Sequence, residues 1–158
     1  MKIKFQDLPY QTDAVNSSVD VFKGETQQDS EFTISLSSGF QGSAFTDDDV
    51  GIANRQSISN EQMLKNVQRV QFLNKLPQSD SIFGTNDAFP QFNIEMETGT
   101  GKTFVYFKTI LELSQKYGFK KFIIVVPSVA IKEGVIKTFN MTKETFANAF
   151  HGMVYNLF

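Results

Sequence analysis

Cysteine and tryptophan are absent from this 158-residue sequence, which also contains only one histidine. Without thiols the chain can form no disulfide framework, no cysteine-ligated zinc site and no cysteine nucleophile. A run of about 18 apolar residues, which could span a bilayer, is also lacking, and the polar start does not resemble a signal peptide. We therefore expect a cytoplasmic protein without membrane contact, in which 17 phenylalanines supply the core of one soluble domain.

The chain also lacks a large excess of charge, since its formal net charge is −2. The charge is uneven, however: residues 1–101 carry 7 basic and 14 acidic side chains, whereas residues 102–158 carry 8 basic and 3 acidic ones. Any contact with DNA is therefore expected from the second part. Because the lysines form no dense run, scattered solvated lysines on helix faces are an equally good interpretation.

Helical spacing of apolar residues appears twice in the first half of the chain. The first expected helix covers about residues 7–23, with Asp7 as a possible cap and Pro9 in its first turn. The second covers about residues 59–74, where Ser59 is followed three residues later by glutamine, the pattern of a capping box.

Residues 24–91, which contain the second of these helices, are otherwise expected to form an irregular insertion. Much of this segment is rich in Ser, Gln, Asp and Gly, with one short alternation at residues 32–36 that favours a strand or a hairpin arm. The acidic run at residues 47–49 is interpreted as solvated, because it lacks the ligand spacing of a calcium loop. We assign no catalysis to His151.

The character of the sequence changes after residue 91. Residues 92–96 and 122–126 favour strands, and Pro127 stops the second, whose continuous apolar run suits a strand covered on both faces. Helices are expected over residues 102–117 and about 129–139. Strand, helix and strand in this order predict an α/β fold with a parallel sheet and a right-handed crossover.

The strongest local signal is the segment Met-Glu-Thr-Gly-Thr-Gly-Lys-Thr at residues 96–103, between the expected strand and helix. It matches the second half of the P-loop pattern, in which glycines let backbone N–H groups converge on phosphate oxygens at a helix N-terminus. Gly99 and Gly101 allow the tight turn, Lys102 would neutralise the β- and γ-phosphates, and the Thr103 hydroxyl would coordinate Mg²⁺.

The motif departs from the strict pattern, since Met96 stands five residues before Gly101, where a glycine is expected. This departure counts against most small GTPases and kinases. It is similar to motif I of superfamily 2 helicases and translocases, in which Thr98 and Thr100 would belong to the nucleotide-binding turn. Glu95 and Glu97 flank Met96 and are interpreted as positional variants of the motif, although either could approach the turn.

Two further segments fit the same superfamily. Pro9, Tyr10 and Gln11 resemble its nucleotide-recognition element, in which a Gln amide can accept from adenine N6–H and donate to N7. Taken alone, Gln11 would more simply be a solvent-facing helical residue. The segment after the second expected strand resembles motif Ia, which contacts a nucleic-acid backbone, and Ser128 and Lys132 are the candidate contacts. Ser128 would equally serve as a helix cap.

Residues 92–139, together with residues 5–23, resemble the Res subunit of Type III restriction-modification enzymes. The resemblance implies a RecA-like P-loop NTPase domain, of which residues 1–158 are the N-terminal part, with an adenine-recognition helix over residues 1–23 and the P-loop unit over residues 92–158. It also implies ATP and Mg²⁺ as cofactors, double-stranded DNA as a partner, and a modification (methyltransferase) subunit. In that family a distant nuclease domain cuts the DNA.

Two groups needed for hydrolysis in such motors are missing. No Asp follows Asp87 and no Arg follows Arg69, so neither the Asp-Glu motif that holds Mg²⁺ nor an arginine finger occurs after the Gly-rich turn. The chain is therefore expected to be an N-terminal fragment that binds nucleotide but does not turn it over. Two alternatives stay open: the N-terminal lobe of another superfamily 2 helicase, and an inert interaction module.

Overall fold

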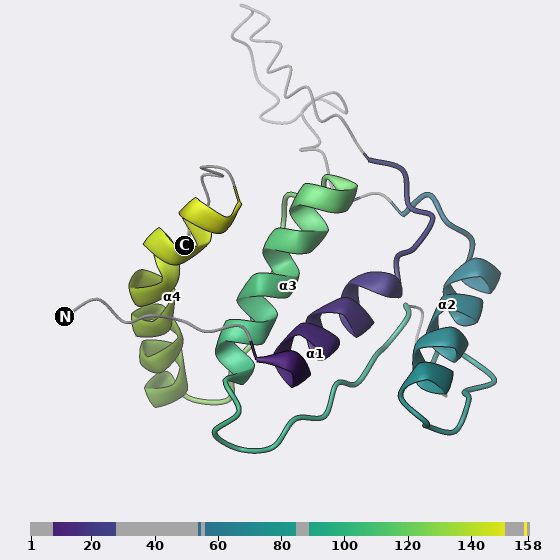
Figure 1. Cartoon of the computed structure of the whole chain (residues 1–158), viewed down its shortest axis with the longest axis horizontal. Coiled ribbons are helices and arrows are strands. Elements are labelled where there is room, and N and C mark those ends of the chain that lie inside the picture. Colours follow the sequence, from purple (N-terminus) through teal and green to yellow (C-terminus); the bar gives the residue numbers. More distant parts are fainter. Residues whose placement is uncertain (1–7, 28–53, 55, 85–88, 151–156, 158) are drawn as a thin grey trace, which may run out of the picture.

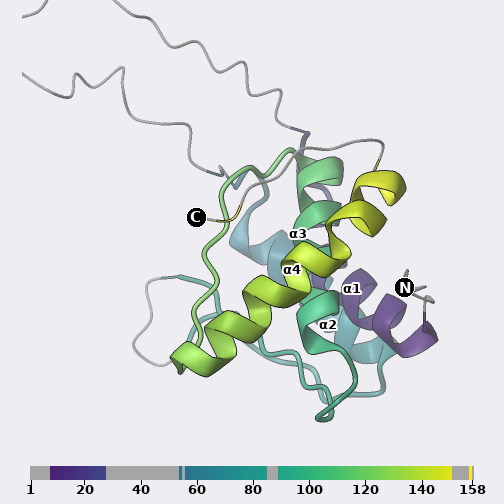
Figure 2. The same ribbon diagram turned by 90° about the vertical axis from the view of Figure 1, so that its left-hand side faces the viewer.

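The structure is a computed structural model that describes residues 8–27, 54, 56–84, 89–150 and 157. Within these ranges the chain forms four helices and no strand, namely α1 (Pro9–Asp20), α2 (Asn60–Leu73), α3 (Lys102–Tyr117) and α4 (Val129–Ala149) (Figure 1). α3 lies in the centre with α1 on one side and α4 on the other, and α2 packs on α1. α4 crosses α3 obliquely, as the second view shows (Figure 2).

The first two helices begin as their sequences predict. Pro9 occupies the first turn of α1, where its fixed φ suits the helix and its missing N–H leaves no donor unpaired. Leu8, with extended φ and ψ, holds the N-cap position that we had expected for Asp7, a residue outside the described ranges. Ser59 caps α2, because its side chain accepts a hydrogen bond from the backbone N–H of Gln62 at 3.2 Å.

Two glycines in the left-handed conformation flank α3, one at each end. Gly101 precedes the helix with φ 85°, and Gly118 follows it with φ 74° and donates its N–H to the Ser114 carbonyl. α4 is longer than predicted, since it continues to Ala149 rather than ending near Phe139. It continues because buried side chains recur at helical spacing up to Phe146 and keep one face against α3.

The core consists of apolar clusters on two sides of α3. On the α1 side, Val15 and Val19 pack against Leu113 and Tyr117 of α3. On the α4 side, Phe107 and Leu111 pack against a set of α4 side chains that includes Val135, Phe139 and Phe146. A third cluster joins α2 to the end of α1 through Met63, Val67, Val21 and Ile82. α3 is therefore buried along two faces, as its largely apolar sequence requires.

The predicted parallel sheet is wrong for the part of the chain that the structure describes. Residues 92–96 and 122–126 lie on either side of α3 in the sequence but form no ladder, and the one backbone bridge among the described residues pairs Phe83 with Pro90. A strand exists only where a second backbone completes its hydrogen bonds, and apolar patterning specifies an extended segment without specifying that partner. The α/β, RecA-like class is thus replaced here by a helical arrangement.

The prediction that residues 122–126 are covered on both faces is also wrong. Phe122, Ile124 and Val126 turn towards the α3 clusters, whereas Ile123 is 92% exposed and Val125 is 88% exposed. The segment therefore has the alternation of an extended chain packed on one side only.

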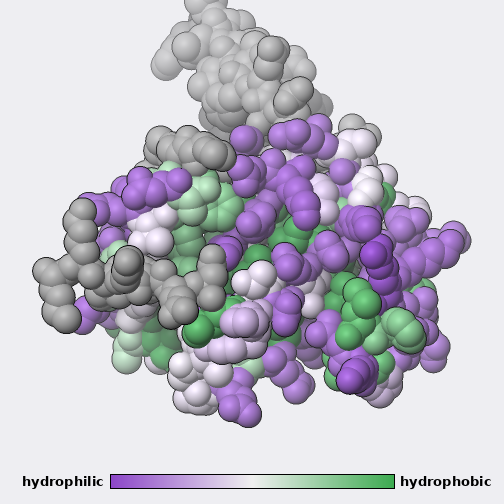
Figure 3. All heavy atoms as spheres, viewed as in Figure 1, coloured by the Kyte–Doolittle hydropathy of each residue, from purple (hydrophilic) through white to green (hydrophobic). Residues whose placement is uncertain are grey.

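Exposed apolar side chains also gather at the end of α2. The face of the molecule that Figure 3 shows is largely hydrophilic, with an apolar patch over α2. Phe72, Leu73 and Leu76 are each more than half exposed there.

Side-chain hydrogen bonds hold together the described residues that flank residues 28–53. The buried Glu25 carboxylate accepts from the backbone N–H groups of Ser57 and Ile58, at 2.6 and 3.3 Å. Asn54 bonds the backbone of Lys120 and Lys121, just after α3. The predicted strand at residues 32–36, like the acidic run at 47–49 and His151, falls outside the described residues.

Candidate functional site

The Gly-rich turn links the extended residues 92–96 to α3. Gly99 and Gly101 have φ values of 82° and 85°, a conformation that costs side-chain-bearing residues about 1–2 kcal/mol. Between them, the Thr100 hydroxyl donates to the Glu97 carbonyl at 2.6 Å. The two glycines therefore allow the chain to reverse over a few residues and enter α3.

The N-terminus of α3 leaves several backbone donors available. Gly101 offers no side-chain cap, and no acidic residue occupies the first turn. The N–H groups of Gly99, Gly101, Lys102 and Thr103 donate to no other residue that the structure describes. Unpaired N–H groups and the positive end of the helix dipole together favour an anion at this position.

Lys102 lies at the first position of α3 with an exposed side chain. Its Nζ folds back over the turn and donates to the carbonyls of Met96 and Glu97 at 2.9 and 2.7 Å. An ammonium group has three donors, so one N–H remains after these two bonds.

Gln11 reaches the same turn from α1, although 89 positions separate it from Thr100. Its Nε2 donates to the Thr100 carbonyl at 2.8 Å, and the side chain is only 9% exposed. A Cβ added to Gly101 would lie 2.6 Å from the same Nε2 atom, so the two residues are in close contact. The simpler interpretation of Gln11, a solvent-facing helical residue, does not hold.

Ser128 and Lys132 lie at the start of α4. The Ser128 side chain caps the helix by accepting from the Ile131 N–H at 3.3 Å, as predicted, and both residues are exposed. Among the described residues no hydrogen bond joins either of them to the Gly-rich turn. Gln11 therefore lies against residues 98–103, whereas the two candidate DNA contacts, Ser128 and Lys132, are not bonded to that turn.

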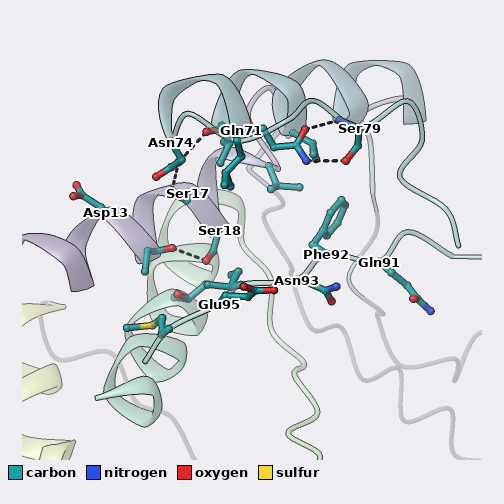
Figure 4. A pocket seen from close by; sticks show the side chains of 18 of the residues that line it. Asp13, Ser17, Ser18, Gln71, Asn74, Ser79, Gln91, Phe92, Asn93 and Glu95 are labelled. Atoms are coloured by element: carbon teal, nitrogen blue, oxygen red, sulfur yellow. Dashed lines mark hydrogen bonds between the residues drawn. The ribbon is translucent and has the colours of Figure 1, made fainter. Parts of the chain in front are cut away.

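A groove that sequence reasoning missed runs beside the turn. It has a volume of about 1120 Å³ and lies between α1, α2 and the extended residues 91–97, with α3 contributing Thr109 and Leu113 (Figure 4). Its charged lining residues are all acidic, namely Asp13, Glu95 and Glu97. The three carboxylates would repel a phosphate group from this groove. No local pattern marks the groove, because it arises from the packing of three distant segments.

Two kinds of site have no support in the described part of the chain. Groups of three or more His, Asp or Glu side chains that could hold a metal ion do not occur among those residues. None of the four helices is both long and apolar enough to cross a membrane.

Comparisons with known proteins agree with the resemblance seen in the sequence. The family described as "Type III restriction enzyme, res subunit" matches residues 4–156. The EcoPI Res subunit of Escherichia phage P1 is 31% identical over 133 residues, which cover 83% of this chain and 12% of that protein. The EcoP15I Res subunit of Escherichia coli is 38% identical over 79 residues, covering 50% of this chain and 8% of that protein.

A shorter match has a higher identity. The StyLTI Res subunit of Salmonella typhimurium strain LT2 is 62% identical over 42 residues, which cover 27% of this chain and 4% of that protein. The chain thus spans at most 12% of the length of these curated relatives. With the family matching nearly the whole sequence, the chain belongs to the Res subunits of Type III restriction enzymes.

Proposed function

We propose that this chain is the ATP-binding part of a Res subunit and that residues 98–103 hold the phosphates of a magnesium–nucleotide complex. The observation that carries the proposal is the Gly-rich turn at the uncapped N-terminus of α3, against which Gln11 is packed. Neither feature alone would suffice, since many helices begin without a cap. Together they bring unpaired backbone N–H groups and the Gln11 amide to one turn, and this supports the proposal.

The donors present suit a phosphate group. The free N–H groups of the turn would bind phosphate oxygens, and the third N–H of Lys102 would add a charge-assisted hydrogen bond. Lys102 would thereby stabilise the negative charge that develops on the transferred phosphoryl group, which is its catalytic role in this proposal.

Thr103 is the protein residue proposed to bind Mg²⁺, with the remaining ligands supplied by phosphate oxygens and water. Such a site needs few protein ligands, because Mg²⁺ retains several waters and bridges phosphates. When bound, Mg²⁺ neutralises charge on the β- and γ-phosphates.

Gln11 is proposed to recognise adenine. Its NH₂ group has two donors, and the bond to the Thr100 carbonyl uses only one of them. The second N–H and the amide oxygen could bind adenine N7 and N6–H. Because the same side chain touches the turn, base recognition and the phosphate-binding backbone would be connected through one residue.

The activity of the whole protein is proposed from its family. We infer an ATP-dependent, helicase-like DNA endonuclease of the cytoplasm that acts on double-stranded DNA with a modification (methyltransferase) subunit. The relatives are themselves named as Res subunits of restriction-modification enzymes. Ser128 and Lys132, exposed at the start of α4, would contact the phosphate backbone of the DNA.

The proposal is tested by nucleotide binding. Binding of a fluorescent ATP analogue in the presence of Mg²⁺ should weaken about 10-fold or more in Lys102→Ala, because a hydrogen bond to a charged group contributes about 1.5–3 kcal/mol. Lys116→Ala, in the last turn of the same helix, is the matched control and should bind like the wild type.

Equal binding by wild type and Lys102→Ala, or no binding by either, would contradict the proposal. An interaction module without nucleotide would then be favoured, and the exposed Ile123 and Val125 side chains and the groove are the features that support it.

A further inference from the structure

The Tyr106 hydroxyl is a buried polar group whose role is unexplained by the packing of α3. Its oxygen is inaccessible to solvent and has no hydrogen-bond partner among the residues that the structure describes. Its ring packs on the α4 side of α3, with its centroid 4.9 Å from that of Phe107. Phenylalanine would make the same ring contacts without burying an unpaired hydroxyl, so the oxygen points to a function other than packing.

Thr103 is the polar residue that lies about one helical turn before Tyr106 on α3. The two residues are three positions apart on α3, a spacing that places side chains side by side on one helix face. Burial raises the pKa of Tyr106 above 10.0, whereas the neighbouring Thr103 side chain opposes that rise. The two hydroxyls are thus neighbours, although their geometry in this state does not complete a hydrogen bond.

The Thr103 hydroxyl also differs from the other threonine hydroxyls in the described helices that make backbone hydrogen bonds. Thr109, Thr138 and Thr142 each donate to the carbonyl four residues earlier, at 2.8–2.9 Å. Such back-bonding occupies the hydroxyl proton. Thr103 forms no bond of this kind among the described residues, because it is the second residue of α3 and the carbonyl four residues earlier, that of Gly99, lies before the helix. Its hydroxyl is therefore not held by back-bonding within the helix.

We propose that Tyr106 is a positioning residue for Thr103: its phenolic oxygen accepts the Thr103 hydroxyl proton when a divalent cation binds the Thr103 oxygen. The hydrogen bond directs the Thr103 lone pairs at the cation, and no proton is transferred. A hydroxyl bound to a cation is a stronger donor, so the bond forms on loading rather than in the empty site. This inference rests on the proposed function, because it assigns a partner to the proposed Mg²⁺ ligand.

The experiment compares the wild type with Tyr106→Phe and Tyr117→Phe. The second variant is a matched control, because Tyr117 lies on the same helix and donates its hydroxyl to the Val19 carbonyl at 3.4 Å, on the side of α1. Binding of a fluorescent ATP analogue is measured with Mg²⁺ and again with EDTA, and thermal unfolding is followed for all three proteins.

The expected result is specific to the metal. Wild type and Tyr117→Phe bind the analogue more tightly with Mg²⁺ than with EDTA. For Tyr106→Phe the ratio of these two affinities is about 10-fold smaller, the usual effect of removing a hydrogen-bond partner of a metal ligand. Its affinity in EDTA and its unfolding temperature stay at the wild-type values. In a Thr103→Val background, Tyr106→Phe has no further effect.

Other outcomes distinguish a failure of the proposed nucleotide site from a failure of the role inferred for Tyr106. Failure of the wild type to bind nucleotide overturns the proposed function and this inference together. If Mg²⁺ increases the nucleotide affinity of Tyr106→Phe as much as that of the wild type, the inference about Tyr106 is wrong, but the proposed function stands. An equal loss with Mg²⁺ and with EDTA also overturns it, because the hydroxyl would then support the turn or the fold. Should Tyr106→Phe unfold, the hydroxyl is structural and the inference is wrong.

Discussion

Two constraints favour glycine at position 101, one from the backbone conformation and one from a contact with Gln11. The Gly101 φ of 85° disfavours any residue with a side chain, and a Cβ at this position would lie 2.6 Å from Gln11 Nε2. Gly99 has nearly the same φ, 82°, but nothing lies within 4 Å of its missing Cβ. The backbone constraint is therefore common to both glycines, and the contact with α1 belongs to Gly101 alone.

This difference predicts unequal effects of two alanine substitutions. Gly99→Ala should lower the free energy of unfolding by about 1–2 kcal/mol through the left-handed conformation. Gly101→Ala should lower it further, because Gln11 must also move. Urea denaturation measures both, and Gln11→Ala added to Gly101→Ala should remove the excess. Equal losses in the two single variants would contradict the close contact seen here.

At the residue level, the sequence predicted the residue types of the turn but not all of their contacts. The glycines and Lys102 were recognisable from their spacing alone, because the turn and the helix N-terminus are local. Gln11 was identified only through its resemblance to a family motif, since no local rule places a residue against another one 89 positions away. Tyr106 was missed, although its spacing from Thr103 was visible in the sequence.

At the level of elements, helices were predicted well and extended segments poorly. Caps and apolar spacing lie within a helix, so Ser59, Gly101 and Gly118 mark their boundaries locally. The same continuing spacing, read through Phe146, would have given the full length of α4. Residues 122–126 lack such information, because the hydrogen bonds of a strand are made to another segment.

The contact between α1 and α3 predicts a sensitivity to alkaline pH. Burial raises the pKa of Tyr117 above 10.0, and the nearby carboxylates of Asp20 and Glu25 raise it further. The folded state therefore holds the phenol proton more tightly than the unfolded state. This stabilisation is complete below about pH 10 and is lost as pH rises through the raised pKa.

Urea denaturation between pH 9 and pH 11.5 should show this loss. The free energy of unfolding should fall with pH in the wild type and fall less steeply in Tyr117→Phe. Tyr10→Phe is the control, because the Tyr10 side chain is 47% exposed. A slope that is unchanged in Tyr117→Phe would show that the contact between α1 and α3 does not respond to this ionisation.

At the level of the whole molecule, α3 connects the proposed nucleotide site to both halves of the core. Its N-terminus forms the turn, one face packs on α1 and another on α4. The proposed site would therefore rest on a helix that is packed on two faces, and a preorganised phosphate site needs such support.

Nucleotide binding without turnover is the prediction at this scale. The 158 residues contain no Asp after Asp87 and no Arg after Arg69, and an arginine finger alone contributes about 10³ to 10⁵ in rate. A steady-state ATPase assay of this chain, with and without double-stranded DNA, should stay at the level of Lys102→Ala. DNA-stimulated hydrolysis that disappears in that variant would show that these residues suffice for catalysis.

The one-sided packing of residues 122–126 has a practical consequence for this polypeptide in solution. A short apolar run rich in β-branched residues, with its backbone extended and Ile123 and Val125 facing outwards, is the type of segment that templates intermolecular aggregation. Lys120 and Lys121 precede it and Pro127 ends it, in the positions of gatekeeper residues. The charges of the two lysines and the ring of Pro127, which has no N–H to donate, would oppose the pairing of this segment with that of a second copy of the chain.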